Sequence, residues 1–343
     1  MAQVKHNNHF VSQMYLKNWE DSANQIWTYR LLVPRANFRK WNRESIGGVA
    51  FQRDLYTVIS DGQEDDSHER WIDSEFETPA KESLSKVIKE RKLLPSDWSR
   101  LAHFMAAQDV RTPFSYIEST ERLKEKLPEM MEKVLQNGIR RLEELRRDGK
   151  PLPPPSDAPE ADLFNDIFDI TITPNVVPEQ NLGEIRAEIV AGRKLWIRNQ
   201  RFLLTKTAKA LLSHKWSIAR PAPGMSWFTT DHPVLKLNYY KDGNYDLKGG
   251  WGKKGGNLLM PLSPNHLLYT QIGAESPDYF TFSVEDTHKI QKFLAERAYR
   301  WIFAHKQLPY VERIRPRVVD LEQYTYEEKK WKDWHQEQSS FEI

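Results

Sequence analysis

The pattern of apolar positions predicts strands toward both ends of the chain and helices between them. Residues 25–33 alternate and are rich in β-branched and aromatic types, so they predict a strand, and residues 51–59 predict another. From about residue 68 the apolar period lengthens, and helices are expected near 78–88 and 96–108. Residues 179–213 return to helical spacing. The remaining expected elements are short strands at 216–219, 227–229, 234–239, 258–261 and 267–270, a helix at 285–297, a strand at 301–304 and a surface helix at 322–334.

The segment 114–148 is highly charged and carries apolar residues at steps of three and four. Leu127, Met131 and Leu135 belong to this stripe, which predicts a long amphipathic helix. We favour a solvated helical arm that packs by one stripe; the alternative is a zipper that makes a homo-oligomer through the 114–148 helix. Pro151 begins a proline-rich linker that extends to residue 160.

Together these patterns predict an α+β fold with a mixed or antiparallel sheet, a helical middle and a long amphipathic helical arm. We expect a single domain over residues 1–343, with the helical arm and linker of residues 114–160 as an insertion.

Composition narrows the function classes. The chain of 343 residues has a formal net charge of only +2, so no global field favours nucleic acid or a membrane surface, and a nucleic-acid contact would need a local patch. The absence of cysteine excludes disulfides, thiol nucleophiles and thiolate metal sites. The sequence shows no signal-peptide run and no apolar stretch long enough to span a membrane, so we expect a cytoplasmic protein without a membrane partner.

The first twenty residues are unusually rich in groups that are costly to order, because His, Gln and Asn alternate with large apolar side chains. This predicts a docked terminus that builds part of a pocket. His9 and Gln13 would share one face if the segment is helical, and could serve as acid or base and as positioner; the alternative is that both only anchor the terminus. His6 and His9 have metal-ligand spacing, but no further histidine pair completes a zinc set, so no metal ligand is assigned.

Gln108 and Arg111 lie three residues apart before Thr112-Pro113. An arginine there could clamp a carboxylate or phosphate, or pair with a structural acid such as Glu77 or Asp231. For Glu77 we favour pairing with Arg111 over a role as general base. The segment 227–234 places Asp231 at a strand end, where a carboxylate either fixes a turn or serves an active site.

Phosphate-binding loops, dinucleotide fingerprints and the nucleophile elbow are all missing from the sequence.

These motifs resemble a widespread microbial family of unknown function. The resemblance rests on the segments His9–Trp19, Gln108–Pro113, Trp227–Val234 and Pro261–Pro264, whose order and spacing match across most of the chain. Ser12 stands where the family usually has proline, and Trp19 where it has phenylalanine. The resemblance implies that His9, Gln13, Gln108, Arg111 and Asp231 converge.

Our first hypothesis is a hydrolase, such as a nuclease, that acts on nucleic acid or a nucleotide, with microbial defence as a setting suggested by the family. His9 would be acid or base, Gln13 a positioner, Arg111 the anion clamp, and Asp231 the group that orients His9 or acts as base. Substrate binding is assigned to Gln108, Tyr15, Asn18 and Thr230.

A second hypothesis is a non-catalytic ligand- or partner-binding module that uses the same cluster. A third treats the motifs as architectural, with Arg111 and Asp231 as a buried pair. Neither a cofactor nor the substrate can be derived from the sequence.

Overall fold

The computed structural model describes residues 4–149, 170–177 and 182–342. Two units can be distinguished by their internal contacts: Met1–Phe114 with Gln200–Ile343, and Ser115–Asn199. The expected single domain with an insertion at 114–160 stays a prediction, and its linker at 151–160 lies outside the described residues.

Within the described residues, two larger sheets build the core of the first unit. The six-stranded sheet has the order β13 (Asn244–Asp246), β12 (Leu235–Lys241), β14 (Asn257–Ser263), β15 (His266–Gln271), β10 (Ser217–Arg220) and β16 (Tyr279–Thr281). Its neighbours are antiparallel except β10 and β16. The four-stranded sheet is antiparallel and has the order β11 (Thr229–Thr230), β17 (Trp301–Ala304), β2 (Gln25–Arg30) and β4 (Trp41–Ser45).

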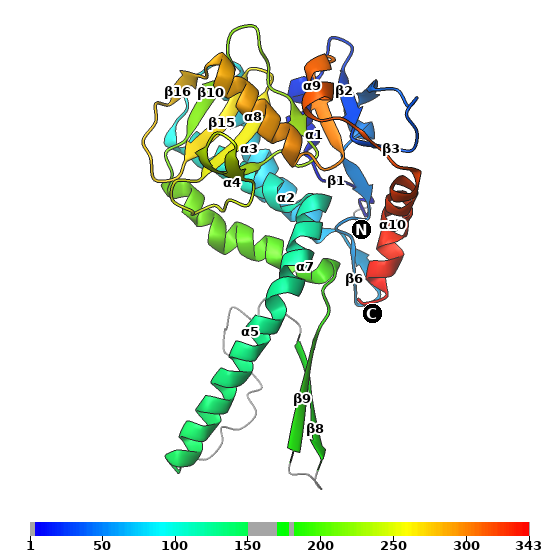
Figure 1. Ribbon diagram of the computed structural model, residues 1–343, viewed down its shortest axis with the longest axis vertical. Coiled ribbons are helices and arrows are strands. Elements are labelled where there is room, and N and C mark those ends of the chain that lie inside the picture. The colour runs from blue at the N-terminus through cyan, green and yellow to red at the C-terminus, as the bar shows by residue number, and fades with distance from the viewer. Residues whose placement is uncertain (1–3, 150–169, 178–181, 343) are drawn as a thin grey trace. The chain divides into compact units, whose positions relative to one another are not determined.

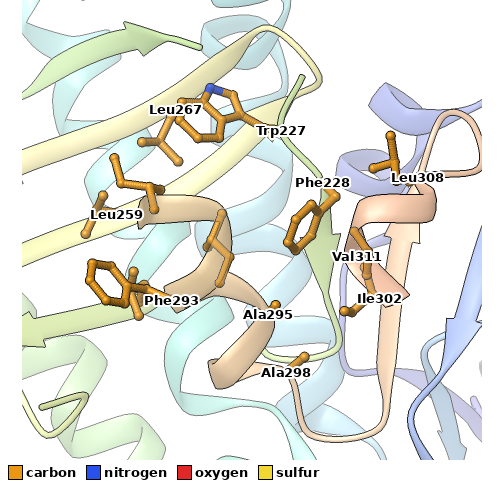
Figure 2. Packing of buried hydrophobic residues seen from close by; sticks show 14 of the residues in the cluster. Trp227, Phe228, Leu259, Leu267, Phe293, Ala295, Ala298, Ile302, Leu308 and Val311 are labelled. Carbon is orange, nitrogen blue, oxygen red and sulfur yellow. The ribbon is translucent and has the colours of Figure 1, made fainter. Parts of the chain in front are cut away.

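Helix α8 (Val284–Arg297) joins both sheets in one hydrophobic cluster, shown in Figure 2. Phe293 and Leu294 of α8 belong to this cluster together with Leu259 of the six-stranded sheet and Ile302 of the four-stranded sheet. Helix α9 (Pro309–Ile314) adds Val311. The large apolar area removed from water here is the main force that holds the two sheets together.

A group of helices in the first unit follows the strand-rich N-terminal part. Helix α2 (Ser67–Ile72) continues through a π-helical turn, Asp73–Glu77, into α3 (Thr78–Ile88), which packs against α4 (Pro95–Val110). Buried Asp97 of α4 accepts hydrogen bonds from Ser83 Oγ at 2.8 Å and Lys86 Nζ at 3.1 Å, and so ties the two helices together. Helix α7 (Arg193–Phe202) begins in the second unit and leads into a π-helical segment, Leu203–Thr207, and a 3-10 helix, Ala208–Ser213, of the first unit.

Short pairings place the two termini of the first unit. Strand β1 (Asn7–His9) pairs with β5 (Phe51–Arg53), β3 (Leu32–Val33) with β18 (Val318–Val319), and β6 (Val58–Ser60) with β7 (Gln63–Asp65). The short helix α1 (Gln13–Leu16) follows β1. The C-terminal helix α10 (Leu321–Ser339) lies beside β3 and β5 (Figure 1), and its N-cap Asp320 accepts a hydrogen bond from the Gln323 N–H.

The second unit contains most of the long helix α5 (Pro113–Arg147). It also contains a hairpin formed by β8 (Ile170–Val177) and β9 (Leu182–Ile189). The helix confirms the predicted arm, whereas the helical spacing expected from residue 179 was wrong over 182–189. Ile185 and Ile189 lie four residues apart, as in a helix, but Ile185, Ala187 and Ile189 also alternate with charged residues, as in a strand. Register pairing with β8 decides in favour of the strand.

The α+β prediction is confirmed, because helices combine with mixed and antiparallel sheets. Across the described parts of the chain, none of the helices has both the length and the apolar character needed to cross a membrane. The cytoplasmic location stays a prediction.

Candidate functional site

His9 and Gln13 meet at the surface of the first unit, although not on one helix. His9 ends β1, and Gln13 begins α1 after the turn at Ser12. The Gln13 amide nitrogen lies 3.0 Å from Nε2 of His9, with the amide exposed and the imidazole nearly buried. Burial lowers the pKa of His9, an effect that a hydrogen bond to the Gly47 backbone partly offsets, so the imidazole is neutral near pH 7.

Arg111 is enclosed in the protein and bonded to acids. It caps the C-terminus of α4, and its side chain is only 1% exposed. The guanidinium donates to Glu77, to Glu69 Oε2 at 3.3 Å and to the backbone carbonyl of His9. Burial acts to lower the pKa of Arg111, but Glu77 and Glu69 outweigh it and raise the pKa. Arg111 therefore ties the N-terminal segment to α2 and to the turn before α3.

Ser12 forms a second set of hydrogen bonds between the N-terminal segment and the helices around Arg111. Its N–H donates to Gln108 Oε1 at 3.2 Å, and its hydroxyl donates to Glu77 Oε2 at 2.6 Å. A proline at this position would lack both donors. Ser12 departs from the family pattern and has a definite role here. Its N–H bonds the terminus to α4, and its hydroxyl bonds the terminus to the turn before α3.

Tyr15 and Asn18 anchor α1 and the turn after it to the sheets. The buried Tyr15 hydroxyl donates to the Pro261 carbonyl at 2.6 Å and lies 2.5 Å from Thr229 Oγ1. The Asn18 amide donates to the Leu262 carbonyl at 2.9 Å. The N-terminal segment therefore contacts the Pro-Leu-Ser-Pro segment, Pro261–Pro264.

Asp231 binds backbone rather than Arg111. Its buried carboxylate accepts N–H bonds from Tyr299 at 2.9 Å, Arg300 at 2.6 Å and Trp301 at 3.0 Å. Burial raises the pKa of Asp231 to about 6, although these three donors act in the opposite direction. Of the two acids expected as alternative partners of Arg111, Glu77 is the one that pairs with it, whereas Asp231 accepts backbone N–H bonds. The neighbouring Thr230 is equally internal, since its hydroxyl accepts the His232 N–H at 3.2 Å.

The Gln-x-x-Arg-Thr-Pro and Thr-Thr-Asp-His-Pro motifs do meet, but through the residues next to the predicted pair. Arg297 donates to His232 Nε2 at 2.7 Å, so Nδ1 carries the proton and donates to Thr112 Oγ1 at 2.6 Å. Burial, followed by the charge of Arg297, lowers the pKa of His232 well below its usual range. Sequence reasoning missed Arg297, because nothing in its helical context marks it as a partner of His232.

A separate cavity of about 930 Å³ lies in the first unit, and we call it the α10 pocket. Its lining comes from α10, from the β5 region, from β2 and β3, and from the segment that Asp231 holds. The lining residues are Phe10, Arg30, Leu32, Glu44, Gly48–Asp54, Pro113, Phe114, Asp231, Tyr299–Trp301, Tyr324, Glu327, Glu328, Trp331, Lys332, His335 and Gln336. Among the described side chains that the sequence nominated, Asp231 is the one in this lining.

Charged groups of both signs line the α10 pocket, and several are already engaged. Arg300 donates to both carboxylate oxygens of Glu327, from Nε at 2.7 Å and from Nη2. The Arg30 guanidinium lies 4.7 Å from the Trp301 ring and 4.6 Å from the Tyr324 ring. Such cation–π contacts fix the aromatic wall at modest energetic benefit.

Helix α10 is joined to the opposite wall of the pocket at its middle, where the Gln52 amide donates to the Trp331 carbonyl at 2.7 Å. Over the described ranges, no cluster of three or more histidine and acidic side chains is arranged to hold a metal ion. His6, one of the two histidines with metal-ligand spacing, instead bonds Asp54 through Nδ1 at 2.7 Å.

Replacing Asp231 by asparagine should loosen the wall of the pocket. Asparagine has one acceptor oxygen, and its NH₂ group would face backbone N–H groups, so we expect a loss of about 1–3 kcal/mol of unfolding free energy. Urea unfolding of the Asp231→Asn variant measures this loss. A variant as stable as the wild type would show that the three backbone bonds do not depend on the carboxylate.

The fold and the pocket thus describe an α+β protein with an aromatic, mixed-charge cavity and a tightly bonded N-terminus. The chain belongs to the family described as "Protein of unknown function (DUF4238)", whose model matches residues 7–307. No curated protein and no solved structure matches the chain. The family match ends before α10, so the helical wall of the pocket lies outside the matched region.

Proposed function

We propose that this protein is a ligand-binding module that takes a small organic molecule in the α10 pocket. The observation that carries the proposal is the pocket itself, whose volume of about 930 Å³ is in the range of small-molecule and cofactor sites. Aromatic rings surround it, and flat aromatic surfaces bind planar ligands at little entropic cost.

The kind of ligand is indicated by the lining groups that are not already engaged by other side chains. Arg300 and Glu327 satisfy each other, and Arg30 is held between two rings, so charge recognition is limited. Phe51, 37% exposed, and Trp331 offer rings to an occupant. A planar aromatic molecule with a polar edge, such as a nucleotide, suits this lining.

Binding is favoured over catalysis because of what the nominated residues already do. Arg111 is bonded to two carboxylates and a carbonyl through its Nη atoms, and its whole side chain is enclosed. A clamp for a substrate anion needs an accessible guanidinium with free donors. The Gln108 carbonyl oxygen likewise accepts the Ser12 N–H rather than facing the pocket.

A ligand screen with two matched variants tests the proposal. Thermal unfolding and tryptophan fluorescence are recorded with nucleotides and with planar aromatic acids and amines. Trp331→Leu should weaken binding of any hit about tenfold, because it removes a ring from the lining. Tyr326→Leu is the control, since Tyr326 lies on the same helix, is 68% exposed and is outside the lining.

Equal affinities of the two variants would contradict binding in the α10 pocket. So would a screen in which no compound shifts the unfolding temperature while native mass spectrometry of the purified protein also shows no bound molecule.

One observation favours the hydrolase of a phosphate-containing substrate as a second candidate. Asp231 is in the pocket lining, and its pKa near 6 lies close to the range used by acid–base residues. If the wild type hydrolyses nucleotides or nucleic acid, and both Asp231→Asn and His9→Ala reduce the rate more than a hundredfold while remaining folded, hydrolysis replaces simple binding as the function. Unchanged hydrolysis in His9→Ala would exclude catalysis by His9.

A further inference from the structure

The turn between α3 and α4 concentrates positive charge that the chain as a whole lacks. Lys89, Arg91 and Lys92 are exposed, and in the part of the chain that the structure describes none of the three has an ion-pair partner. The acid among them, Glu90, is neutralised by Arg220 at 2.7 Å. With a net charge of +2 over 343 residues, this turn is a local positive patch rather than part of a general field.

Aromatic rings lie beside the turn that carries these cations. The Tyr279 hydroxyl, from β16, donates to the Arg91 carbonyl at 3.4 Å, and the Tyr279 ring is 41% exposed. The Trp98 ring of α4 lies 6.5 Å from the Tyr279 ring, centroid to centroid. The three cations of the turn after α3, the Trp98 ring of α4 and the Tyr279 ring of β16 therefore form one surface, which we call the basic turn patch.

The backbone of the turn is held in a defined conformation, so the three cationic residues start from fixed backbone positions. The N–H groups of Lys89, Glu90 and Arg91 donate to carbonyls near the end of α3, and Glu90 takes a left-handed φ of 52°. At the other end Asp97 accepts the Leu94 N–H at 2.8 Å. A preorganised surface loses less conformational entropy on binding than a flexible one.

We propose that the basic turn patch binds single-stranded nucleic acid. Phosphates would pair with Lys89, Arg91 and Lys92, and unpaired bases would stack on Tyr279 and Trp98. Sequence-tolerant binders of single strands combine these two features, since cations follow the backbone and every base has a π face. Duplex bases are already stacked on each other, so the rings favour a single strand. The site is separate from the α10 pocket and independent of what that pocket binds.

Fluorescence anisotropy with a fluorescein-labelled 20-nucleotide oligo-U and oligo-dT tests the proposal. Three phosphate contacts on a single strand predict a slope of about −2 for log K against log salt, so affinity should fall about 20-fold from 50 to 200 mM NaCl. The triple variant Lys89→Ser/Arg91→Ser/Lys92→Ser should bind at least tenfold more weakly at 50 mM salt and show a slope near zero.

The matched control removes the same charge elsewhere. Arg35→Ser/Arg39→Ser/Lys306→Ser changes three exposed cations on other elements, and it should retain both the affinity and the salt slope. Tyr279→Leu should lower the affinity about tenfold without changing the slope, which separates stacking from charge.

Three results would overturn the proposal. One is equal binding by the wild type and the Lys89/Arg91/Lys92 variant, and another is no binding at 50 mM salt. The third concerns Leu94, which is 52% exposed in this turn and would also suit a lipid surface. Binding to vesicles with 30% phosphatidylserine, lost in the triple variant, together with no oligonucleotide binding, would assign the patch to anionic membranes instead.

Discussion

Arg111→Met should lower the free energy of unfolding by about 3–5 kcal/mol, because it leaves buried carboxylates without their partner. Glu69 is buried, and burial already raises its pKa, so it depends on the Arg111 charge for ionisation. Methionine matches much of the arginine volume, so the loss comes from electrostatics and hydrogen bonds rather than from a cavity. The bond to the His9 carbonyl is lost as well, which should free the N-terminal segment. Urea unfolding followed by circular dichroism measures the effect.

Two further variants separate a structural role of Arg111 from a catalytic one. Adding Glu69→Gln and Glu77→Gln to Arg111→Met should restore part of the stability, because the unpaired charges are removed. Arg100→Met, on the same helix but exposed and 4.0 Å from Asp97, should cost less than about 1 kcal/mol. If Arg111→Met is as stable as the wild type, the guanidinium is free to serve a ligand, and the enclosed geometry described above is not its working state.

The sequence predicted the positions of helices more reliably than the partners of individual side chains. Helices at 78–88 and near 96–108 were predicted close to where α3 and α4 lie, because their apolar periods are regular. The pairing of Arg111 with Glu77 was one of two alternatives, and spacing cannot distinguish them since both acids are distant in sequence. The choice depends on the turn after α2, where a π-helical segment brings Glu77 to Ser12 and Arg111.

The α10 pocket could not be predicted because its walls are contributed by separate parts of the chain. Trp331 was expected only on a surface helix, and Gln52 only in a strand, yet the bond between them joins two walls. Asp231 was correctly placed at a strand end, but the three N–H groups it accepts belong to residues that no local pattern connects to it. Long-range backbone bonds of this kind leave no periodic signal in the sequence.

The Thr-Thr-Asp-His-Pro motif has a structural role that its sequence does not indicate. Consecutive residues serve three different neighbours: Thr230 holds its own turn, Asp231 holds the pocket wall, and His232 bonds Thr112 and Arg297. The motif is thus a junction between the helix that ends at Arg111 and the strand that begins at Trp301. Because this motif positions the wall of the α10 pocket, we expect the pocket to be sensitive to the protonation of the buried groups in the motif.

Acidification from pH 7 to 5 should destabilise the protein through two buried neutral histidines. Burial lowers the pKa of His68 from its ordinary 6.5 to about 3, and its Nε2 bonds Gln200 Oε1 at 3.1 Å. Below pH 6.5, His68 therefore binds a proton in the unfolded chain, whereas in the folded chain it stays neutral down to about pH 3. The free energy of unfolding falls over this pH range. At pH 5 the loss from His68 is about 2 kcal/mol. Burial also lowers the pKa of His232 well below its usual range, so His232 adds a loss of the same sign.

Asp231 changes the stability in the opposite direction to the histidines, so it reduces the net loss on acidification. Its folded pKa of about 6 lies above the ordinary 3.8, so the fold gains stability as pH falls through 6, by about 1 kcal/mol at pH 5. Chemical denaturation at pH 7 and 5 should thus show a net loss of unfolding free energy in the wild type, because the loss from His68 alone exceeds the gain from Asp231. In His68→Gln the pH-dependent part should shrink by about 2 kcal/mol, while His288→Gln, at an exposed position of α8, should leave it unchanged. Equal pH dependence in the wild type and His68→Gln would mean that the pKa of His68 is the same in the folded and the unfolded chain, which would contradict the prediction.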